Sequence, residues 1–183
     1  MNISSYIIVK LKELEWSTLI LVLILSASGL LAIYSIEAQH DSSAGYFLRQ
    51  SIWTIIGIVL FLTAYFIPRK VIHNLTYPAY GIGIVLLFIP ILMKSGGSVS
   101  RWIVIGSIGI QPSEFMKIFL LLALAKYFAD HKKRLATLKE LMTPVAMTLG
   151  PTILVLAQPD LGTALVYFGI LIVIIFWAGI KPL

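Results

Sequence analysis

Six long apolar segments, separated by short polar loops, constrain the fold of this chain more than any other feature. They cover residues 16–35, 47–67, 77–93, 112–129, 143–157 and 161–179. A helix of about 20 residues rises about 30 Å, which matches the hydrocarbon core of a bilayer. The composition agrees, because 59% of the residues are hydrophobic, 12% are charged and the mean hydropathy is +0.97. The sequence therefore predicts an all-α, multi-pass membrane protein, with one transmembrane region of six helices over residues 1–183.

The composition also excludes several classes of protein. A soluble domain carries about 25% charged residues, roughly twice the proportion found here. The net charge of +6 does not indicate a nucleic-acid partner, because long apolar runs separate small groups of Lys and Arg. The chain has no cysteine, which excludes disulfides and thiolate chemistry. His40, His73 and His131 are scattered over loops, so no histidine metal site is expected. Membrane lipids remain the expected surroundings.

The distribution of Lys and Arg predicts the orientation of the helices. Ten of the 14 basic residues fall on one side of the predicted membrane: Lys10, Lys12, Arg69, Lys70, Lys126, Lys132, Lys133, Arg134, Lys139 and Lys181. Three fall on the other side, and Lys117 lies within a span. Because basic residues accumulate on the cytoplasmic side, both chain ends are expected inside. Loops 36–46, 94–111 and 158–160 are then outside, and loops 68–76 and 130–142 are inside. Gly150-Pro151 predicts a kink in the fifth helix.

A charged pair lies at the start of the fourth predicted helix. Pro112 suits the first helical turn, where its missing N–H has little cost. Glu114 and Lys117 are three residues apart, so they share one helix face and can pair. Charged residues inside a membrane span are costly and usually face a cavity or a partner. One interpretation is an ion pair that only locks two helices together; the other is a polar site.

The segment before this helix favours an anion contact. Residues 95–100 hold two glycines and three serines, and Arg101 follows them directly. A flexible loop can expose its N–H groups, and a guanidinium binds phosphate with two parallel hydrogen bonds. Trp102 is most simply an anchor at the membrane interface.

A second polar segment, Gln158-Pro159-Asp160, precedes the sixth predicted helix and echoes Gln111-Pro112-Ser113 before the fourth. Asp160 suits an N-cap, which is worth about 1 kcal/mol. Both helix starts face outward in the predicted topology. Helix N-termini carry partial positive charge and free N–H donors, so both starts favour anions.

Two motifs resemble the SEDS family, named for shape, elongation, division and sporulation. The first comprises Arg101-Trp102-Ile103, Gly106, the stretch 111–114 and Lys117; the second is the stretch 158–164. The second motif resembles the RodA branch more than the FtsW branch. The resemblance implies a peptidoglycan glycosyltransferase of cell-wall elongation and cell shape. It would polymerise lipid II at the bacterial inner membrane, alongside a class B penicillin-binding protein.

The same resemblance implies ten helices and about twice this length. The aspartate usually assigned as catalytic in the family lies in a later outer loop, beyond Leu183, and no residue here matches it. The chain is therefore expected to be the N-terminal part of a SEDS-type domain, and its own enzymatic activity stays open. A lipid-carrier flippase and a non-catalytic scaffold of the cell-wall machinery are the alternative functions.

The candidate substrate-binding residues are all expected to lie near the outer helix starts. They are Arg101, Gln111, Ser113, Glu114, Lys117, Gln158 and Asp160. Arg101 and Lys117 would support the departing pyrophosphate, and Glu114 would orient Lys117. Asp160 would shape the same cavity or hold a divalent cation. No metal-ligand set is otherwise expected.

Overall fold

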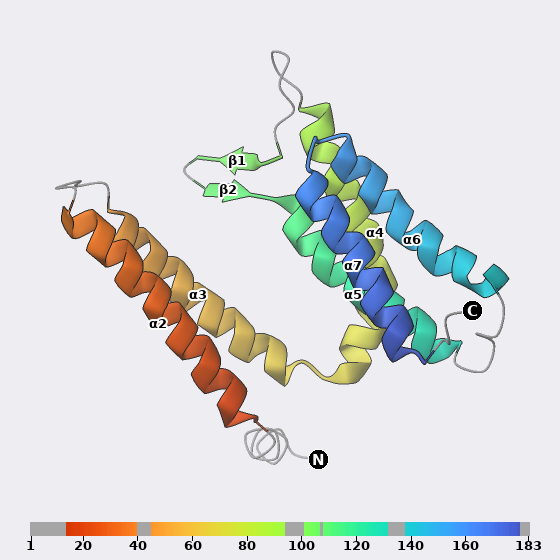
Figure 1. The fold of residues 1–183 in the computed structure, drawn as a ribbon, viewed down its shortest axis with the longest axis horizontal. Coiled ribbons are helices and arrows are strands. Elements are labelled where there is room, and N and C mark those ends of the chain that lie inside the picture. Colours follow the sequence, from red (N-terminus) through yellow and green to blue (C-terminus); the bar gives the residue numbers. More distant parts are fainter. Residues whose placement is uncertain (1–13, 40–44, 94–100, 107, 132–137, 180–183) are drawn as a thin grey trace. The chain divides into compact units, whose positions relative to one another are not determined.

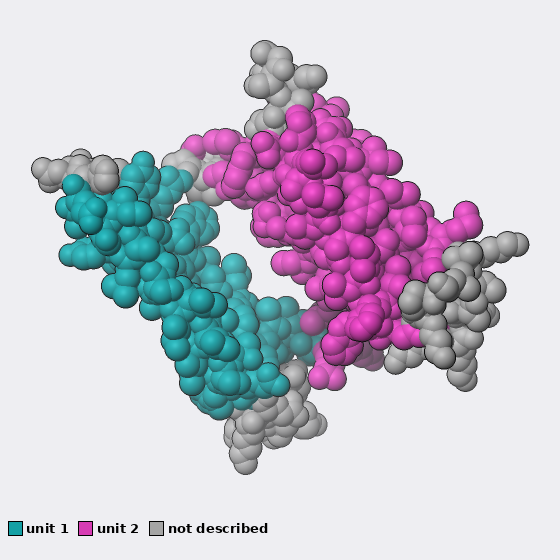
Figure 2. All heavy atoms as spheres, in the orientation of Figure 1, with its two compact units in different colours: residues 1–68 teal, residues 69–183 magenta. Residues whose placement is uncertain are grey.

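The computed structural model describes residues 14–39, 45–93, 101–106, 108–131 and 138–179. These residues form α2 (Trp16–Gln39), α3 (Tyr46–Phe66), α4 (Arg69–Leu92), β1 (Ile103–Ile105), β2 (Ile108–Ile110), α5 (Pro112–Asp130), α6 (Leu138–Leu156) and α7 (Leu161–Trp177) (Figure 1). The chain divides into two units, residues 1–68 and residues 69–183 (Figure 2). The six described helices confirm the predicted all-α class.

The first unit is the helix pair α2 and α3. Neither helix has a buried residue, although both are strongly apolar. A helix that is hydrophobic and unburied within its own chain needs an apolar solvent. The Glu37 carboxylate on α2 accepts the Phe47 N–H at 2.8 Å, which satisfies a free donor in the first turn of α3. Among the described helices, α2 and α3 of this unit and α4 of the second unit are long and apolar enough to cross a membrane.

The second unit packs α4, α6 and α7 around α5 (Figure 1). Its core consists of Leu87, Met116, Leu120, Leu124, Val155, Ala164, Tyr167 and Leu171. Gly83 lets α4 approach α5 closely, because a Cβ there would lie 2.6 Å from the Met116 sulfur. The close contact fixes the position of the first turns of α5, where Glu114 and Lys117 lie.

α4 begins earlier than the sequence predicts. Residues 68–76 were expected as an inner loop, but the helix starts at Arg69. The polar first turns of α4 are bound to the end of α5 instead of forming a loop. Lys126 Nζ donates to the His73 carbonyl at 2.6 Å and lies 4.7 Å from the centre of the Tyr77 ring. His73 Nε2 is 3.4 Å from Asp130 Oδ1.

α6 continues through Gly150 and Pro151 and begins at Leu138, within the predicted loop 130–142. Pro151 has no N–H to donate to the Met147 carbonyl four residues earlier. The Tyr80 hydroxyl on α4 donates to that carbonyl at 2.8 Å. A side chain from a neighbouring helix thus replaces the missing helical donor, which is how membrane helices tolerate proline.

The predicted outer loop 94–111 contains an antiparallel β-hairpin that the sequence analysis missed. Ile103 pairs with Ile110, Val104 with Gly109, and Ile105 with Ile108. The turn between the strands is two residues long, and Gly106 has a φ of +62°, as hairpin turns of this length require. β-branched residues favour strands, but in an apolar chain three-residue strands leave little pattern to recognise.

Candidate functional site

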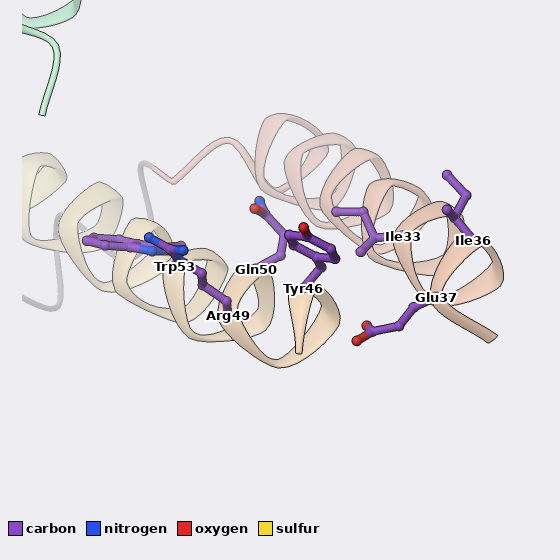
Figure 3. Close-up of a pocket in the computed structure, with 7 residues that line it drawn as sticks. All are labelled: Ile33, Ile36, Glu37, Tyr46, Arg49, Gln50 and Trp53. Carbon is purple, nitrogen blue, oxygen red and sulfur yellow. The ribbon is translucent and has the colours of Figure 1, made fainter. Parts of the chain in front are cut away.

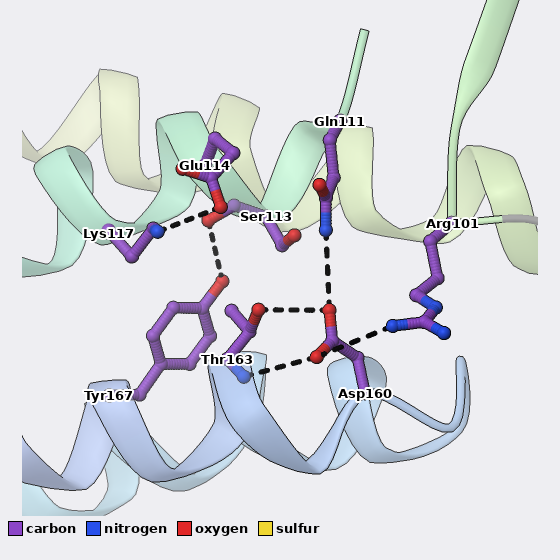
Figure 4. A network of polar contacts seen from close by, with 8 residues as sticks. All are labelled: Arg101, Gln111, Ser113, Glu114, Lys117, Asp160, Thr163 and Tyr167. Carbon is purple, nitrogen blue, oxygen red and sulfur yellow. Dashed lines mark hydrogen bonds and ion pairs between the residues drawn. The ribbon is translucent and has the colours of Figure 1, made fainter. Parts of the chain in front are cut away.

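Asp160 forms the N-cap of α7, as predicted. Its carboxylate accepts the Thr163 N–H at 3.1 Å and the Thr163 hydroxyl at 2.9 Å. The residue is only 8% exposed. The two contacts hold the carboxylate over the first turn of α7 and fix its orientation (Figure 4).

Two side chains from the hairpin segment reach the same carboxylate. Gln111 Nε2, at the start of α5, donates to Asp160 Oδ2 at 3.3 Å. Arg101 Nη1, before β1, lies 3.7 Å from Asp160 Oδ1. The Arg101 side chain is 48% exposed, whereas that of Asp160 is 10% exposed. Asp160 therefore ties the starts of α5 and α7 to the hairpin, while the Arg101 side chain stays half exposed.

The Asp160 carboxylate is held in its charged form. Burial raises its pKa, but the hydrogen bonds from Thr163 and the positive charges of Arg101 and Lys117 outweigh burial and lower the pKa overall. Both oxygens accept donors, and the nearest charges are positive. This donor set does not fit a divalent cation, nor does it favour a base. Among the residues that the structure describes, no group of three or more His, Cys, Asp or Glu side chains could hold a metal ion.

Asp160→Asn should make the stability of the protein less dependent on pH in the acidic range. A carboxyl with a depressed folded-state pKa stabilises the fold above its ordinary pKa of about 3.9, and this contribution is lost as the pH falls through the folded-state value. Asparagine can still cap the helix. Thermal unfolding in detergent, followed by circular dichroism between pH 7 and pH 3, should show the difference between wild type and variant shrinking. A difference that stays constant with pH would contradict this assignment.

The predicted pair on α5 is confirmed. Lys117 Nζ lies 2.8 Å from Glu114 Oε1, and the two side chains are 29% and 53% exposed. Lys117 also contributes to the electrostatic field at Asp160. Two cations and two carboxylates thus belong to one cluster, shown with its hydrogen bonds in Figure 4.

Ser113 joins this cluster through its backbone. The Tyr167 hydroxyl on α7 donates to the Ser113 carbonyl at 3.1 Å, which links the first turns of α5 and α7. The Ser113 Oγ atom is buried and has no hydrogen-bond partner within the described part of the chain. A buried hydroxyl without a partner is unusual and costly, so this atom is a candidate contact for a bound ligand.

Gln158 lies apart from the cluster. Its amide is buried and donates to the Leu87 carbonyl on α4 at 2.8 Å. The sequence echo between Gln111 and Gln158 therefore does not extend to their contacts. Sequence reasoning also left out Thr163 and Tyr167. Their signal was present, because Thr163 follows a capping aspartate by three residues and Tyr167 lies one further turn along the same face.

A hollow of about 570 Å³ lies between α2 and α3, within the first unit (Figure 3). Its lining consists of Ile33, Ile36, Glu37, Tyr46, Arg49, Gln50 and Trp53. None of the seven predicted site residues lines this hollow.

The fold and the cluster define a multi-pass helical membrane protein with paired charges at the starts of two neighbouring helices. A profile of the FtsW/RodA/SpoVE family, described as cell cycle proteins, matches residues 14–182, and this chain belongs to that family. The predicted SEDS assignment is therefore confirmed.

Individual relatives agree. Peptidoglycan glycosyltransferase RodA of Treponema pallidum is 32% identical over 170 residues, which cover 91% of this chain and 39% of that protein. A probable peptidoglycan glycosyltransferase FtsW of Trichlorobacter lovleyi is 30% identical, covering 94% of this chain and 48% of that protein. The chain thus spans less than half the length of these two relatives.

Solved structures show the same fold. The crystal structure of Thermus thermophilus rod shape determining protein RodA matches with a TM-score of 0.78 and 31% identity, over 91% of this chain and 54% of that one. A chain from a peptidoglycan synthase complex, in which polymerization and crosslinking are coordinated, matches equally well over 90% of this chain and 48% of that one.

Proposed function

We propose that this chain forms the phosphate-binding part of a peptidoglycan glycosyltransferase that polymerises lipid II during cell-wall elongation. Membership of the family and the names of its relatives support this activity. The observation that carries the proposal is the pair of cations, Arg101 and Lys117, each held by a carboxylate beside the starts of α5 and α7. Lipid II carries a pyrophosphate, which matches this arrangement of cations and helix N-termini.

The geometry indicates which part of the reaction these residues serve. In glycosyl transfer, the acceptor hydroxyl oxygen forms a bond to the anomeric carbon of the donor sugar. The bond from that carbon to the pyrophosphate breaks, and the hydroxyl proton passes to a base. Arg101 and Lys117 stabilise the negative charge that develops on the departing pyrophosphate. Asp160 and Glu114 are positioning residues, because their carboxylates are already paired with Arg101 and Lys117.

The base then comes from another part of the polymerase. Both Asp160 oxygens accept donors, and Glu114 is paired at 2.8 Å. The positive charges of Arg101 and Lys117 favour the ionised Asp160 carboxylate and make it a weaker base. This agrees with the resemblance, which places the catalytic aspartate of the family beyond Leu183.

We also infer the orientation of the chain in the membrane and the class of its partner. The excess of Lys and Arg on one side supports cytoplasmic chain ends, with the starts of α5 and α7 at the outer face of a bacterial cytoplasmic membrane. The likeness to a chain from a synthase complex supports assembly with a class B penicillin-binding protein, which supplies crosslinking.

The test is polymerisation by the full-length protein that contains this chain. Purified in detergent with its penicillin-binding partner, it should convert labelled lipid II into glycan strands on a gel. Arg101→Gln should lower the rate by about 10²-fold, because a preorganised cation is lost. Arg101→Lys should keep part of the activity, since it keeps the charge but loses the bidentate geometry. A protein that makes no strands, but moves lipid II between leaflets of liposomes, would be a transporter and would contradict the proposal.

A further inference from the structure

The β-hairpin of β1 and β2 is apolar on both of its faces. Trp102 and Val104 lie on one face, and these residues are 50% and 63% exposed. Ile103 and Ile110 pair on the other face, where Ile110 is 38% exposed. An antiparallel hairpin in water carries polar residues on its solvated face. Here no charged residue occurs between Arg101 and Glu114.

The depth of the hairpin along the axis of α5 is also restricted. Gln111 alone separates β2 from the first residue of α5, and one residue spans at most about 3.6 Å. Three-residue strands are only about 10 Å long. Within the second unit, the hairpin extends sideways from the start of α5 and does not continue the helix axis (Figure 1). It therefore lies at the level where the predicted span 112–129 begins.

We propose that this hairpin is an interfacial anchor that inserts Trp102, Val104 and Ile110 into the headgroup region of the leaflet at the start of α5. Lipid is the occupant that covers the exposed residues on both faces. Three features select it: the absence of charge, the one-residue connection to α5, which is a predicted membrane helix, and a tryptophan, which favours the boundary between water and hydrocarbon.

The Trp102 ring contributes to the apolar surface of the hairpin. It lies over Gly109 on the neighbouring strand, where an added Cβ would come within 3.3 Å of the ring. The ring thus occupies the space that a side chain at position 109 would fill, and joins both strands in one apolar surface. An isolated two-stranded hairpin is marginal in water, so burial in the interface would also stabilise it.

The anchor has a consequence for the polar cluster. Arg101 directly precedes Trp102 and contacts Asp160. Inserting the hairpin fixes the guanidinium at headgroup level, where the phosphates of a lipid-linked substrate lie. This consequence rests on the proposed function, whereas the anchor itself does not.

The experiment uses the full chain in liposomes. Because the native chain has no cysteine, Val104→Cys can carry an environment-sensitive fluorophore without interference. Ile110→Cys gives a second position on the opposite face. Ser98→Cys, in the predicted outer loop outside the described residues, provides the aqueous reference. Monodisperse elution in detergent and unchanged helix content verify that each variant is folded.

Insertion predicts strong quenching at position 104 by lipids that carry a spin label at the headgroup. It also predicts about threefold less quenching by iodide than at position 98, because interfacial depth excludes an aqueous anion. Iodide quenching equal to that at position 98 would overturn the anchor. Shielding of positions 104 and 110 from both quenchers would also overturn it, since protein and not lipid would then cover the hairpin. Neither result would bear on whether the full-length protein polymerises lipid II.

Discussion

Lys117→Met is expected to lower lipid II polymerisation by the full-length protein about 10²–10³-fold, the cost of removing a preorganised charge from the transition state. The protein should still fold and insert. The Glu114 side chain is 53% exposed within the described structure, so removing its partner does not leave a charge buried in the protein core. The double variant Glu114→Gln with Lys117→Met should be no more active than the single variant. Initial rates from labelled lipid II measure this directly.

A purely structural role of the Glu114–Lys117 ion pair predicts the opposite result. If the pair only locked helices together, removing both charges would leave nothing unpaired, and the double variant would recover a near wild-type rate. Lys126→Met provides a matched control, because it makes the same substitution near the other end of α5. Lys126 contacts His73 and Tyr77, far along the helix from the cluster, so its loss should leave polymerisation unchanged.

Local contacts of the cluster could be predicted from sequence. Glu114 and Lys117 pair because helical geometry brings positions three apart together, and Asp160 caps α7 because an N-cap aspartate can accept the N–H three residues later. Both depend only on helix starts, which Pro112 and Pro159 help to locate. Such contacts need no knowledge of the tertiary fold.

Contacts between elements could not be predicted in this way. Gln111 and Gln158 occur in similar tripeptides, yet one contacts Asp160 and the other the Leu87 carbonyl. The packing of α4, α5 and α7 decides between these partners. The same reason applies to Tyr80, which satisfies a carbonyl freed by Pro151 on another helix. The early start of α4 was missed because its polar first turns are held by Lys126 and Asp130 from α5.

Residues 1–183 alone are expected to insert into a membrane but not to polymerise lipid II. Within the cluster, Glu114 and Asp160 are both paired with cations. General-base catalysis contributes typically 10²–10⁴-fold, so a chain whose polar cluster supplies no free base should show activity close to background. Co-expression with the remaining half of the polymerase should restore strand synthesis.

Gel analysis of glycan products from labelled lipid II distinguishes a chain that binds the pyrophosphate and supplies no base from a chain that carries the base itself. The samples are the purified chain alone, the chain with the co-expressed second half, and each of these with Asp160→Asn. Strands should form only when both halves are present, and Asp160→Asn should lower the rate of their synthesis because Arg101 loses its ion-pair partner. Strands made by the chain alone and abolished by Asp160→Asn would instead identify Asp160 as the base.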